Sequence, residues 1–395
     1  MQNSKFRFDR LELSGSLGDL GTLIPLSVAL IIIAGLNVSV VFLTIGLFYI
    51  ASGIYFRLPI PVQPLKVVAA IAIAYPEKIT IAVLMASSIL MGVFLLFLAV
   101  TGLINKIAGL FSKPIVRGIQ LGLGMILILK GISFIRKPEL FISGINTIDS
   151  IWVIPMNLFV GIIAFFIVLF LLRSKKYPAA LIIVAGGVLI GILFGAFPNT
   201  DFVIGVMPIE IGFPNSADFM NALILLVIPQ IPLTIGNAII GTKDACESFF
   251  GKSELTKRAT HKAFSYSMGI ANVFIGLLGG IPLCHGAGGL AAHYRFGART
   301  GGSNIMIGVT FLILALLFGK IGIAILSIIP NSILGILLLF AGLELAMLIL
   351  DVREKQSLFI VLIVAGIGFT TNNMALAFIA GMLVNYIIRW RNIRI

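Results

Sequence analysis

The chain has 395 residues, of which 59% are hydrophobic and 11% are charged, and its formal net charge is +13. Soluble domains are about 45–50% apolar and about 25% charged, so the composition excludes a soluble globular protein and indicates an integral membrane protein. The two cysteines, Cys246 and Cys284, are too few for a disulfide framework, and their spacing is not that of a metal site.

Apolar stretches such as ITIAVLMASSILMGVFLLFLAV are long enough to cross the ~30 Å hydrocarbon core of a bilayer as helices. In chain order, a polar segment at residues 1–14, expected to be a cytosolic tail, precedes fourteen apolar segments. These lie at about 15–34, 38–56, 60–75, 79–102, 114–134, 151–172, 178–197, 222–241, 262–279, 281–294, 303–318, 330–349, 357–370 and 374–390. The sequence therefore predicts an all-α polytopic membrane protein.

The basic residues indicate how these segments are oriented. With a cytosolic N-terminus, Lys78, Arg136, Lys137 and Lys320 fall in outside loops and two lysines fall within spans, which leaves 22 of the 28 Lys and Arg residues inside. This asymmetry is the positive-inside bias of membrane proteins. The net charge thus reflects topology rather than nucleic-acid binding, and we expect a cell-membrane protein with both termini in the cytosol.

Fourteen spans divide into two sets of seven, at residues 15–197 and 222–395, joined by an extracytoplasmic linker at 198–221. Because each set has an odd number of spans, the second set begins on the opposite side of the membrane and is inverted relative to the first. Two motif pairs support this repeat: PVQPLKVVAAIA parallels PLCHGAGGLAAHY, and Pro114 and Pro330 each begin an apolar, glycine-bearing helix. Inverted repeats are typical of secondary transporters, whose substrate site lies near the midplane where discontinuous helices meet.

The third and tenth segments are the candidate half-helices. Three prolines between residues 59 and 64 keep the start of the third segment extended, and helix begins near Pro64. Pro282 does the same for the tenth segment, whose helix begins near residue 285 or 286. The segments enter from opposite faces, so both helices begin near mid-membrane. A helix N-terminus carries roughly +0.5 charge and unpaired N–H groups, so two facing N-termini predict a site for a small oxyanion.

The motifs PIPVQPLKVVAAIA (59–72) and PLCHGAGGLAAHYRFGARTGG (282–302) resemble the molybdate transporter family, which is related to the SulP sulfate permeases, and SLGDLGTLIPL (16–26) also fits. The resemblance covers essentially the whole chain. It implies a SulP/UraA-like fold of seven plus seven inverted helices, with core and gate domains and an oxyanion between the third and tenth helices. It also implies molybdate as substrate, with sulfate or tungstate as close competitors, a choice that the residues alone do not make.

Two candidate contacts lie on the third segment. Lys66 in the first turn of a half-helix is costly without an anionic partner, unless it snorkels to an interface. Gln63 either contacts the substrate or caps the exposed helix start. On the eighth segment, Gln230 and Asn237 either line the cavity or form bonds between helices.

The start of the tenth segment holds the other candidates, His285, Gly286, Ala287 and Gly288. The glycines leave backbone open to an anion, or they serve close helix packing. His285 either contacts the anion, takes up a proton or is structural. The sequence does not choose among these roles.

Asp19 and Glu344 are the acids predicted inside spans, and they are candidates for proton coupling because protonation removes repulsion when an anion loads. The alternatives are a salt bridge with Lys66 or Lys130, or a solvated Glu344. Guanidinium suits oxyanions, yet the topology puts Arg295 and Arg299 at the cytosolic end of the tenth helix. We therefore expect a topogenic or gating role for them.

These features predict a secondary active importer of a small tetrahedral oxyanion that works by alternating access and is coupled to protons. A sulfate permease is the alternative, followed by a nucleobase or bicarbonate carrier of the same fold, which Lys66 and the bare glycine backbone disfavour. No Walker motif is present, and Cys284 and His285 are adjacent, which is a poor arrangement for a catalytic pair. We expect no enzyme activity, no cofactor and no metal, and we leave a homodimer open.

Overall fold

The computed structural model describes residues 6–107, 112–141, 150–151, 154–172, 174, 178–196, 204–209 and 212–391. In the first half, the helices are α1 (Arg10–Ser16), α2 (Leu20–Ala34), α3 (Val38–Phe56), α4 (Lys66–Ala74), α5 (Ile81–Thr101), α6 (Ile104–Ile107), α7 (Lys113–Ile135), α8 (Met156–Leu171) and α9 (Ala179–Leu193). In the second half, they are α10 (Ser216–Ala222), α11 (Ile228–Leu233), α12 (Thr242–Phe250), α13 (His261–Leu278), α14 (Ala287–Phe296), α15 (Gly302–Ser327), α16 (Asn331–Ala346), α17 (Lys355–Thr371) and α18 (Met374–Arg391). The strands are β1 (Gln63–Pro64), β2 (Ser150–Ile151), β3 (Ile154–Pro155) and β4 (Leu283–Cys284).

The helices confirm a multi-pass membrane protein. In the described residues, six helices are long and apolar enough to cross a membrane, and α1 with α2, bent by 45°, forms a seventh span if the two are taken together. The remaining predicted segments coincide with helices that are shorter or less apolar. The predicted segment 222–241 is part of a longer helix, Ser216–Phe250, in which π-helical turns at Leu223–Val227 and Thr234–Gly241 join α10, α11 and α12.

The two halves are related as an inverted repeat. Helices α7 and α16 cross in opposite directions at two glycine pairs: a Cβ on Gly124 would lie 2.5 Å from the Gly342 carbonyl oxygen, and one on Gly131 would lie 2.5 Å from that of Gly335. Likewise, α3 packs against α15, and α5 against α13. In the order of the spans, α3 and α5 are the second and fourth, and α13 and α15 are the ninth and eleventh. A two-fold axis in the membrane plane exchanges α3 with α13 and α5 with α15, so it converts the α3–α15 pair into the α5–α13 pair.

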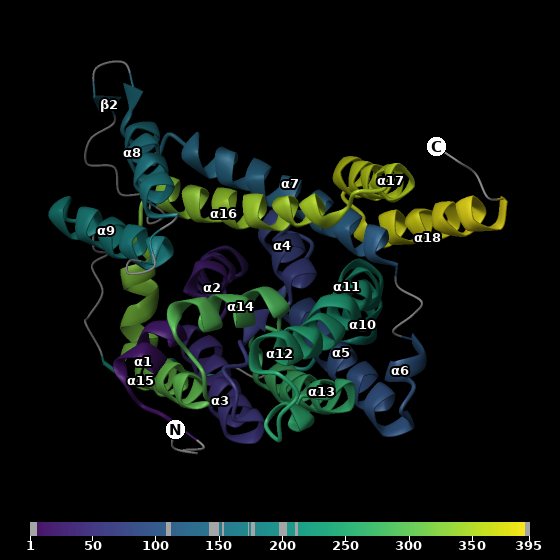
Figure 1. Cartoon of the computed structure of the whole chain (residues 1–395). Coiled ribbons are helices and arrows are strands. Elements are labelled where there is room, and N and C mark those ends of the chain that lie inside the picture. The colour runs from purple at the N-terminus through teal and green to yellow at the C-terminus, as the bar shows by residue number, and fades with distance from the viewer. Residues whose placement is uncertain are drawn as a thin grey trace.

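The helices form two layers, each built from both halves (Figure 1). Helices α7, α8, α9, α16, α17 and α18 form the upper layer in this view, and the other helices lie below it. The short α4 stands between the layers and packs against α7. This division positions the site, because the half-helices belong to the lower layer and α16 faces them from the upper one.

Residues 6–16, most of the segment expected to be a tail, are folded against the lower layer. The Glu12 carboxylate accepts hydrogen bonds from the backbone N–H groups of Arg299 and Thr300, at 3.1 and 3.0 Å, and the Arg7 N–H donates to the Thr300 hydroxyl at 3.1 Å. The predicted boundary at residue 14 therefore falls inside α1. Residues 1–5, together with 198–203, 210 and 211 of the predicted linker, lie outside the described residues.

Candidate functional site

The two half-helices begin next to each other at the centre of the molecule. Strands β1 and β4 pair antiparallel, with Gln63 opposite Cys284 and Pro64 opposite Leu283, and the Leu65 N–H donates to the Pro282 carbonyl at 2.8 Å. Each strand leads into its helix, α4 or α14. Because the strands are antiparallel, the helices run apart and their N-termini lie close together. The prediction of two half-helices in the third and tenth segments is confirmed.

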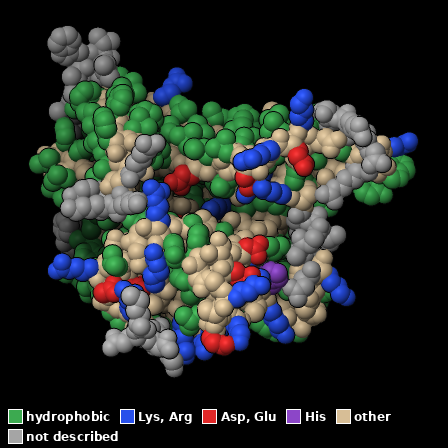
Figure 2. Space-filling view, viewed as in Figure 1, with side chains coloured by type: hydrophobic (Ala, Val, Ile, Leu, Met, Phe, Trp, Pro, Cys, Tyr) green, Lys and Arg blue, Asp and Glu red, His purple; other side chains and the backbone are tan. Residues whose placement is uncertain are grey.

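A cavity of about 250 Å³ lies at this crossing, between the two layers. It is smaller than the pockets of about 300–1,000 Å³ that hold drug-sized ligands, so it suits a small ion. Figure 2 shows a hollow between the layers with acidic and basic side chains around it. The lining residues come from the α1–α2 bend, the half-helices and the end of α16: Gly18, Asp19, Gly21, Thr22, Leu26, Gln63, Lys66, Gly288, Gly289, Ala292, Ala341, Glu344, Leu345 and Leu348.

Lys66 is the basic residue in the lining of this cavity. It is the first residue of α4, and its side chain is half-buried. None of the five ion pairs between described residues includes Lys66, so the salt bridge to Asp19 considered from the sequence is absent in this conformation. A positive charge without an ion-pair partner among the described residues therefore faces a small cavity that also holds two acids.

Asp19 is held by Gln63 instead. The Gln63 amide Nε2 donates to both carboxylate oxygens of Asp19 at 2.7 Å, and the two side chains are only 1% and 3% exposed. The amide oxygen of Gln63 is buried and has no hydrogen-bond partner among the described residues. Gln63 therefore orients Asp19, and its donor group is already occupied.

The start of α14 presents bare backbone to the cavity. The first N–H groups of a helix have no acceptor within it, and the first helical bond here is from Leu290 to the Gly286 carbonyl, at 3.1 Å. A Cβ on Gly289 would lie 2.5 Å from Gln63 Nε2, whereas a Cβ on Gly288 would meet nothing within 4 Å. Gly289 thus lets α14 approach the Asp19–Gln63 pair, and Gly288 leaves its backbone open.

Five of the predicted substrate contacts lie outside the cavity lining: Gln230, Asn237, His285, Gly286 and Ala287. Gln230 caps α4, since its side-chain oxygen accepts the Val67 N–H at 2.9 Å and its Nε2 donates to Thr234 at 2.9 Å. This is the bonding between helices considered from the sequence. The Asn237 amide lies behind the start of α14, 3.5 Å from the position of a Cβ on Gly286.

His285 points away from the cavity. Its Nδ1 lies 2.8 Å from the Pro61 carbonyl oxygen and its Nε2 lies 3.0 Å from the Ser267 hydroxyl. The carbonyl can only accept, so Nδ1 carries the proton and Nε2 accepts from the serine. The ring is fully buried and packs on Phe48 and two further phenylalanines. Of the three roles considered for His285, this placement matches the structural one.

The two predicted acids line the cavity, whereas the two predicted arginines do not. Asp19 lines the cavity from the lower layer and Glu344 lines it from α16 in the upper layer. Arg295 and Arg299 are not in the lining. The Arg299 guanidinium donates to the Tyr294 and Ala298 carbonyls at 2.6 and 2.8 Å and stacks 3.7 Å from the Tyr294 ring. It is engaged at the end of α14.

Besides five apolar residues, the lining residues missed from the sequence are three glycines and a threonine, namely Gly18, Gly21, Thr22 and Gly289. Their signals were present in the quoted motifs, since SLGDLGTL contains three of them and GAGG contains the fourth.

Two inverted halves, with half-helices meeting at a charged cavity between two layers, define a membrane protein with the SulP fold. Solved structures share this fold: the transmembrane domain of a cyanobacterial bicarbonate transporter, BicA, matches with a TM-score of 0.61 and 17% identity, covering 96% of this chain and 97% of that one. The murine anion transporter Slc26a9, described in an inward-facing state, matches with a TM-score of 0.68 and 16% identity, covering 99% and 70%.

Residues 11–127 and 222–345 match the family described as molybdate transporter of the MFS superfamily. Molybdate transporter 2 of Arabidopsis thaliana is 31% identical over 97% of this chain and 88% of its own length, and Molybdate transporter 1 of the same plant is 30% identical over 98% and 90%. Molybdate transporter 1 of Chlamydomonas reinhardtii is 26% identical over 94% and 90%. The chain belongs to the molybdate transporter family, so it is a transporter and not an enzyme.

Proposed function

We propose that this protein imports molybdate across the cell membrane by alternating access, in symport with protons. The anion binds in the cavity between the starts of α4 and α14. One observation carries the proposal: Lys66 faces this cavity, beside two helix N-termini, without an ion-pair partner among the described residues. The relatives named as molybdate transporters support the choice of oxyanion.

Lys66 and the backbone of α14 share the work of binding. The ammonium supplies a full charge and up to three donors, while the N–H groups at Gly288 and Gly289 supply fixed donors that an oxyanion can approach closely. Sulfate and tungstate have the same tetrahedral shape and charge as molybdate. They are therefore the expected competitors.

The acids link loading to protons. With Asp19 and Glu344 both ionised, their two negative charges offset Lys66 and two helix ends of roughly half a charge each. A dianion then meets no net attraction. Protonation of either acid restores a positive field, so substrate and proton bind better together than apart.

In the proposed topology, with cytosolic termini, this conformation faces the cytosol. The cavity lining continues from Gln63 to Ala292 and Leu348, toward the cytosolic ends of α14 and α16. At the other end of α4, the Tyr75 hydroxyl bonds to Asn372, and Lys130 donates to the Ala74 carbonyl at 3.4 Å. These contacts join the two layers and close the outer side. Movement of one layer against the other opens it.

Uptake of labelled molybdate into proteoliposomes tests the proposal, with sulfate, tungstate, bicarbonate and uracil as competitors and with or without a pH gradient. We expect tungstate and sulfate to compete and an inward proton gradient to stimulate uptake. Competition by uracil or bicarbonate without competition by the oxyanions refutes the proposed substrate.

The variant Lys66→Ala tests whether this lysine binds the anion. Because a hydrogen bond to a charged group contributes about 1.5–3 kcal/mol, we expect molybdate affinity to fall about 10–100-fold, with unchanged membrane insertion. Lys257→Ala is the control, since Lys257 is exposed, pairs with Glu254 and does not line the cavity. Wild-type uptake by the Lys66 variant removes this lysine from the site.

A further inference from the structure

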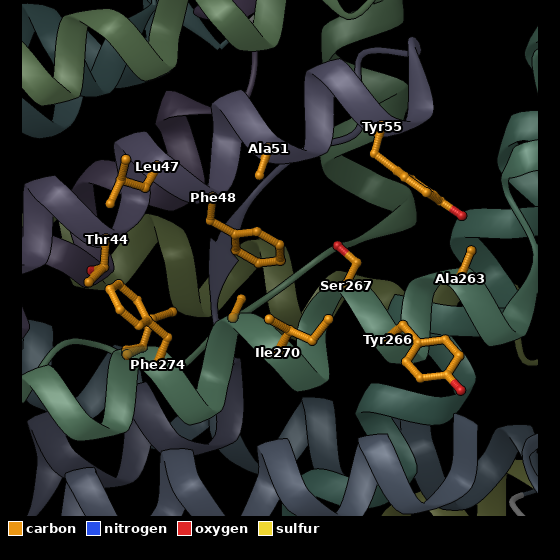
Figure 3. A pocket seen from close by; sticks show the side chains of 12 residues that line it. Thr44, Leu47, Phe48, Ala51, Tyr55, Ala263, Tyr266, Ser267, Ile270 and Phe274 are labelled. Carbon is orange, nitrogen blue, oxygen red and sulfur yellow. The ribbon is translucent and has the colours of Figure 1, made fainter. Parts of the chain in front are cut away.

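A second and larger cavity, of about 490 Å³, lies between α3 and α13. Figure 3 shows the residues that line it, with Leu47, Phe48, Ala51 and Tyr55 on α3 and Tyr266, Ser267 and Ile270 on α13. No residue lines both this groove and the oxyanion cavity. It is therefore a separate feature that transport of an anion does not explain.

The groove is apolar and open along its length. Leu47, Ile270 and Phe274 are 41%, 62% and 50% exposed, although they lie on helices that pass through the bilayer. At that depth the surroundings are hydrocarbon rather than water. An occupant that fits such a groove is an apolar chain.

One end of the groove is basic. Tyr55 on α3 and Tyr266 on α13 both lie toward this end. The Arg258 guanidinium donates to the Tyr55 carbonyl at 3.0 Å, and Lys262 Nζ lies 5.8 Å from the centre of the Tyr266 ring. Neither cation belongs to an ion pair between described residues. Tyrosines beside cations are typical of the level of the lipid headgroups.

We propose that this groove binds an anionic glycerophospholipid of the surrounding bilayer. An acyl chain lies between α3 and α13, and the phosphate-bearing headgroup lies at Arg258 and Lys262. Basic pockets between transmembrane helices recognise anionic headgroups in this way. An apolar groove with a cationic end is complementary to that one class of molecule.

The groove wall also contacts the structure that holds the half-helices. The Phe48 ring lies 5.0 Å from the His285 ring, and the Ser267 hydroxyl bonds to His285 Nε2. His285 in turn bonds to Pro61, two residues before Gln63. A lipid that fills the groove therefore supports the wall behind β1, and its binding stabilises the folded protein.

Thermal unfolding of the delipidated protein in detergent, titrated with phosphatidylglycerol or with phosphatidylcholine of the same acyl chains, tests the inference. Native mass spectrometry counts the lipid that remains bound. We expect phosphatidylglycerol to raise the Tm in a saturable way and to be retained, and phosphatidylcholine to bind more weakly. Equal effects of the two lipids overturn the proposal.

Two kinds of variant locate the site. Arg258→Gln and Lys262→Gln are each expected to weaken phosphatidylglycerol binding about fivefold, whereas Lys257→Gln in the same loop leaves it unchanged. Ala51→Trp fills the groove and abolishes retention, while Leu189→Trp, on exposed surface of α9, does not. If the Arg258 and Lys262 variants retain phosphatidylglycerol as the wild type does, the proposal is overturned. It is also overturned if the Ala51→Trp protein still retains this lipid while its oligomeric state changes, because the groove is then an interface between copies of the chain. None of these readouts depends on the transported anion.

Discussion

The close approach of α14 to Asp19 and Gln63 gives a sharp test at Gly289. An added methyl group there would lie 2.5 Å from Gln63 Nε2 and 2.7 Å from Asp19 Oδ2. Gln63 cannot swing aside freely, because two hydrogen bonds of 2.7 Å hold it on the carboxylate. Gly289→Ala must therefore either shift α14 or break the Asp19–Gln63 pair.

Gly288→Ala is the matched control, one residue away in the same helical turn. A Cβ on Gly288 meets nothing within 4 Å. Both substitutions carry the same gain in helix propensity, about 1 kcal/mol, so this gain cancels when the variants are compared. What remains is the cost of overpacking at Gly289, about 1–3 kcal/mol.

Thermal stability in detergent measures the comparison most directly, since both residues line the cavity and either methyl group narrows it. We expect Gly289→Ala to unfold at a lower temperature than Gly288→Ala, and its molybdate uptake to fall further because Asp19 loses its orientation. If the two variants have the same Tm and the same uptake, the close packing at Gly289 does not constrain the site.

Three other predictions follow from the same geometry. His285→Ala leaves Pro61 and Ser267 without their partner and opens space among aromatic rings. The free energy of unfolding should therefore fall by about 2–4 kcal/mol, while the pH profile of uptake keeps its shape. An altered pH profile at unchanged Tm would assign His285 to proton coupling. Glu344→Gln and Asp19→Asn mimic protonated acids, and at least one should make uptake insensitive to the pH gradient in proteoliposomes, whereas full stimulation in both argues against the proposed coupling. Tyr75→Phe or Asn372→Ala should weaken the closure of the outer side. In a Ser133→Cys background, an impermeant thiol reagent should then label the new cysteine faster, while the native Cys246 and Cys284 are buried. An unchanged labelling rate means that the Tyr75–Asn372 bond does not hold the outer side closed.

The helix starts at the site were predictable because proline acts locally. Three prolines before Leu65 exclude helix there, and α4 begins at Lys66. Pro282 acts in the same way on the tenth segment, and α14 begins at Ala287, one or two residues after the predicted start. The rule depends on the backbone of the residues concerned, so no knowledge of the fold was needed.

The N-terminal segment was predicted less well because its partners are distant in sequence. Polar residues at 1–14 suggested a cytosolic tail but gave no sign of its fold, in which Asp9 caps α1 by accepting the N–H groups of Leu11 and Glu12. Glu12 then bonds to the backbone of Arg299 and Thr300. The composition of a segment does not reveal bonds that cross nearly the whole chain. For the same reason, the sequence left open whether Gln230 bonds between helices or lines the cavity, and did not identify the Val67 N–H as its partner.

The roles of His285 and Gly286 depend on strand register, which neither composition nor periodicity contains. Successive side chains of an extended segment point to opposite faces. Gly286 faces Gln63, since a Cβ there would lie 2.8 Å from the Gln63 amide oxygen, and His285 must then face the other way, toward Ser267 and the aromatic rings. A shift of one residue between β1 and β4 would exchange the two. With Gln63 opposite Cys284, the imidazole supports the crossing from behind, and the open backbone at Gly288 and Gly289 is left to meet an anion.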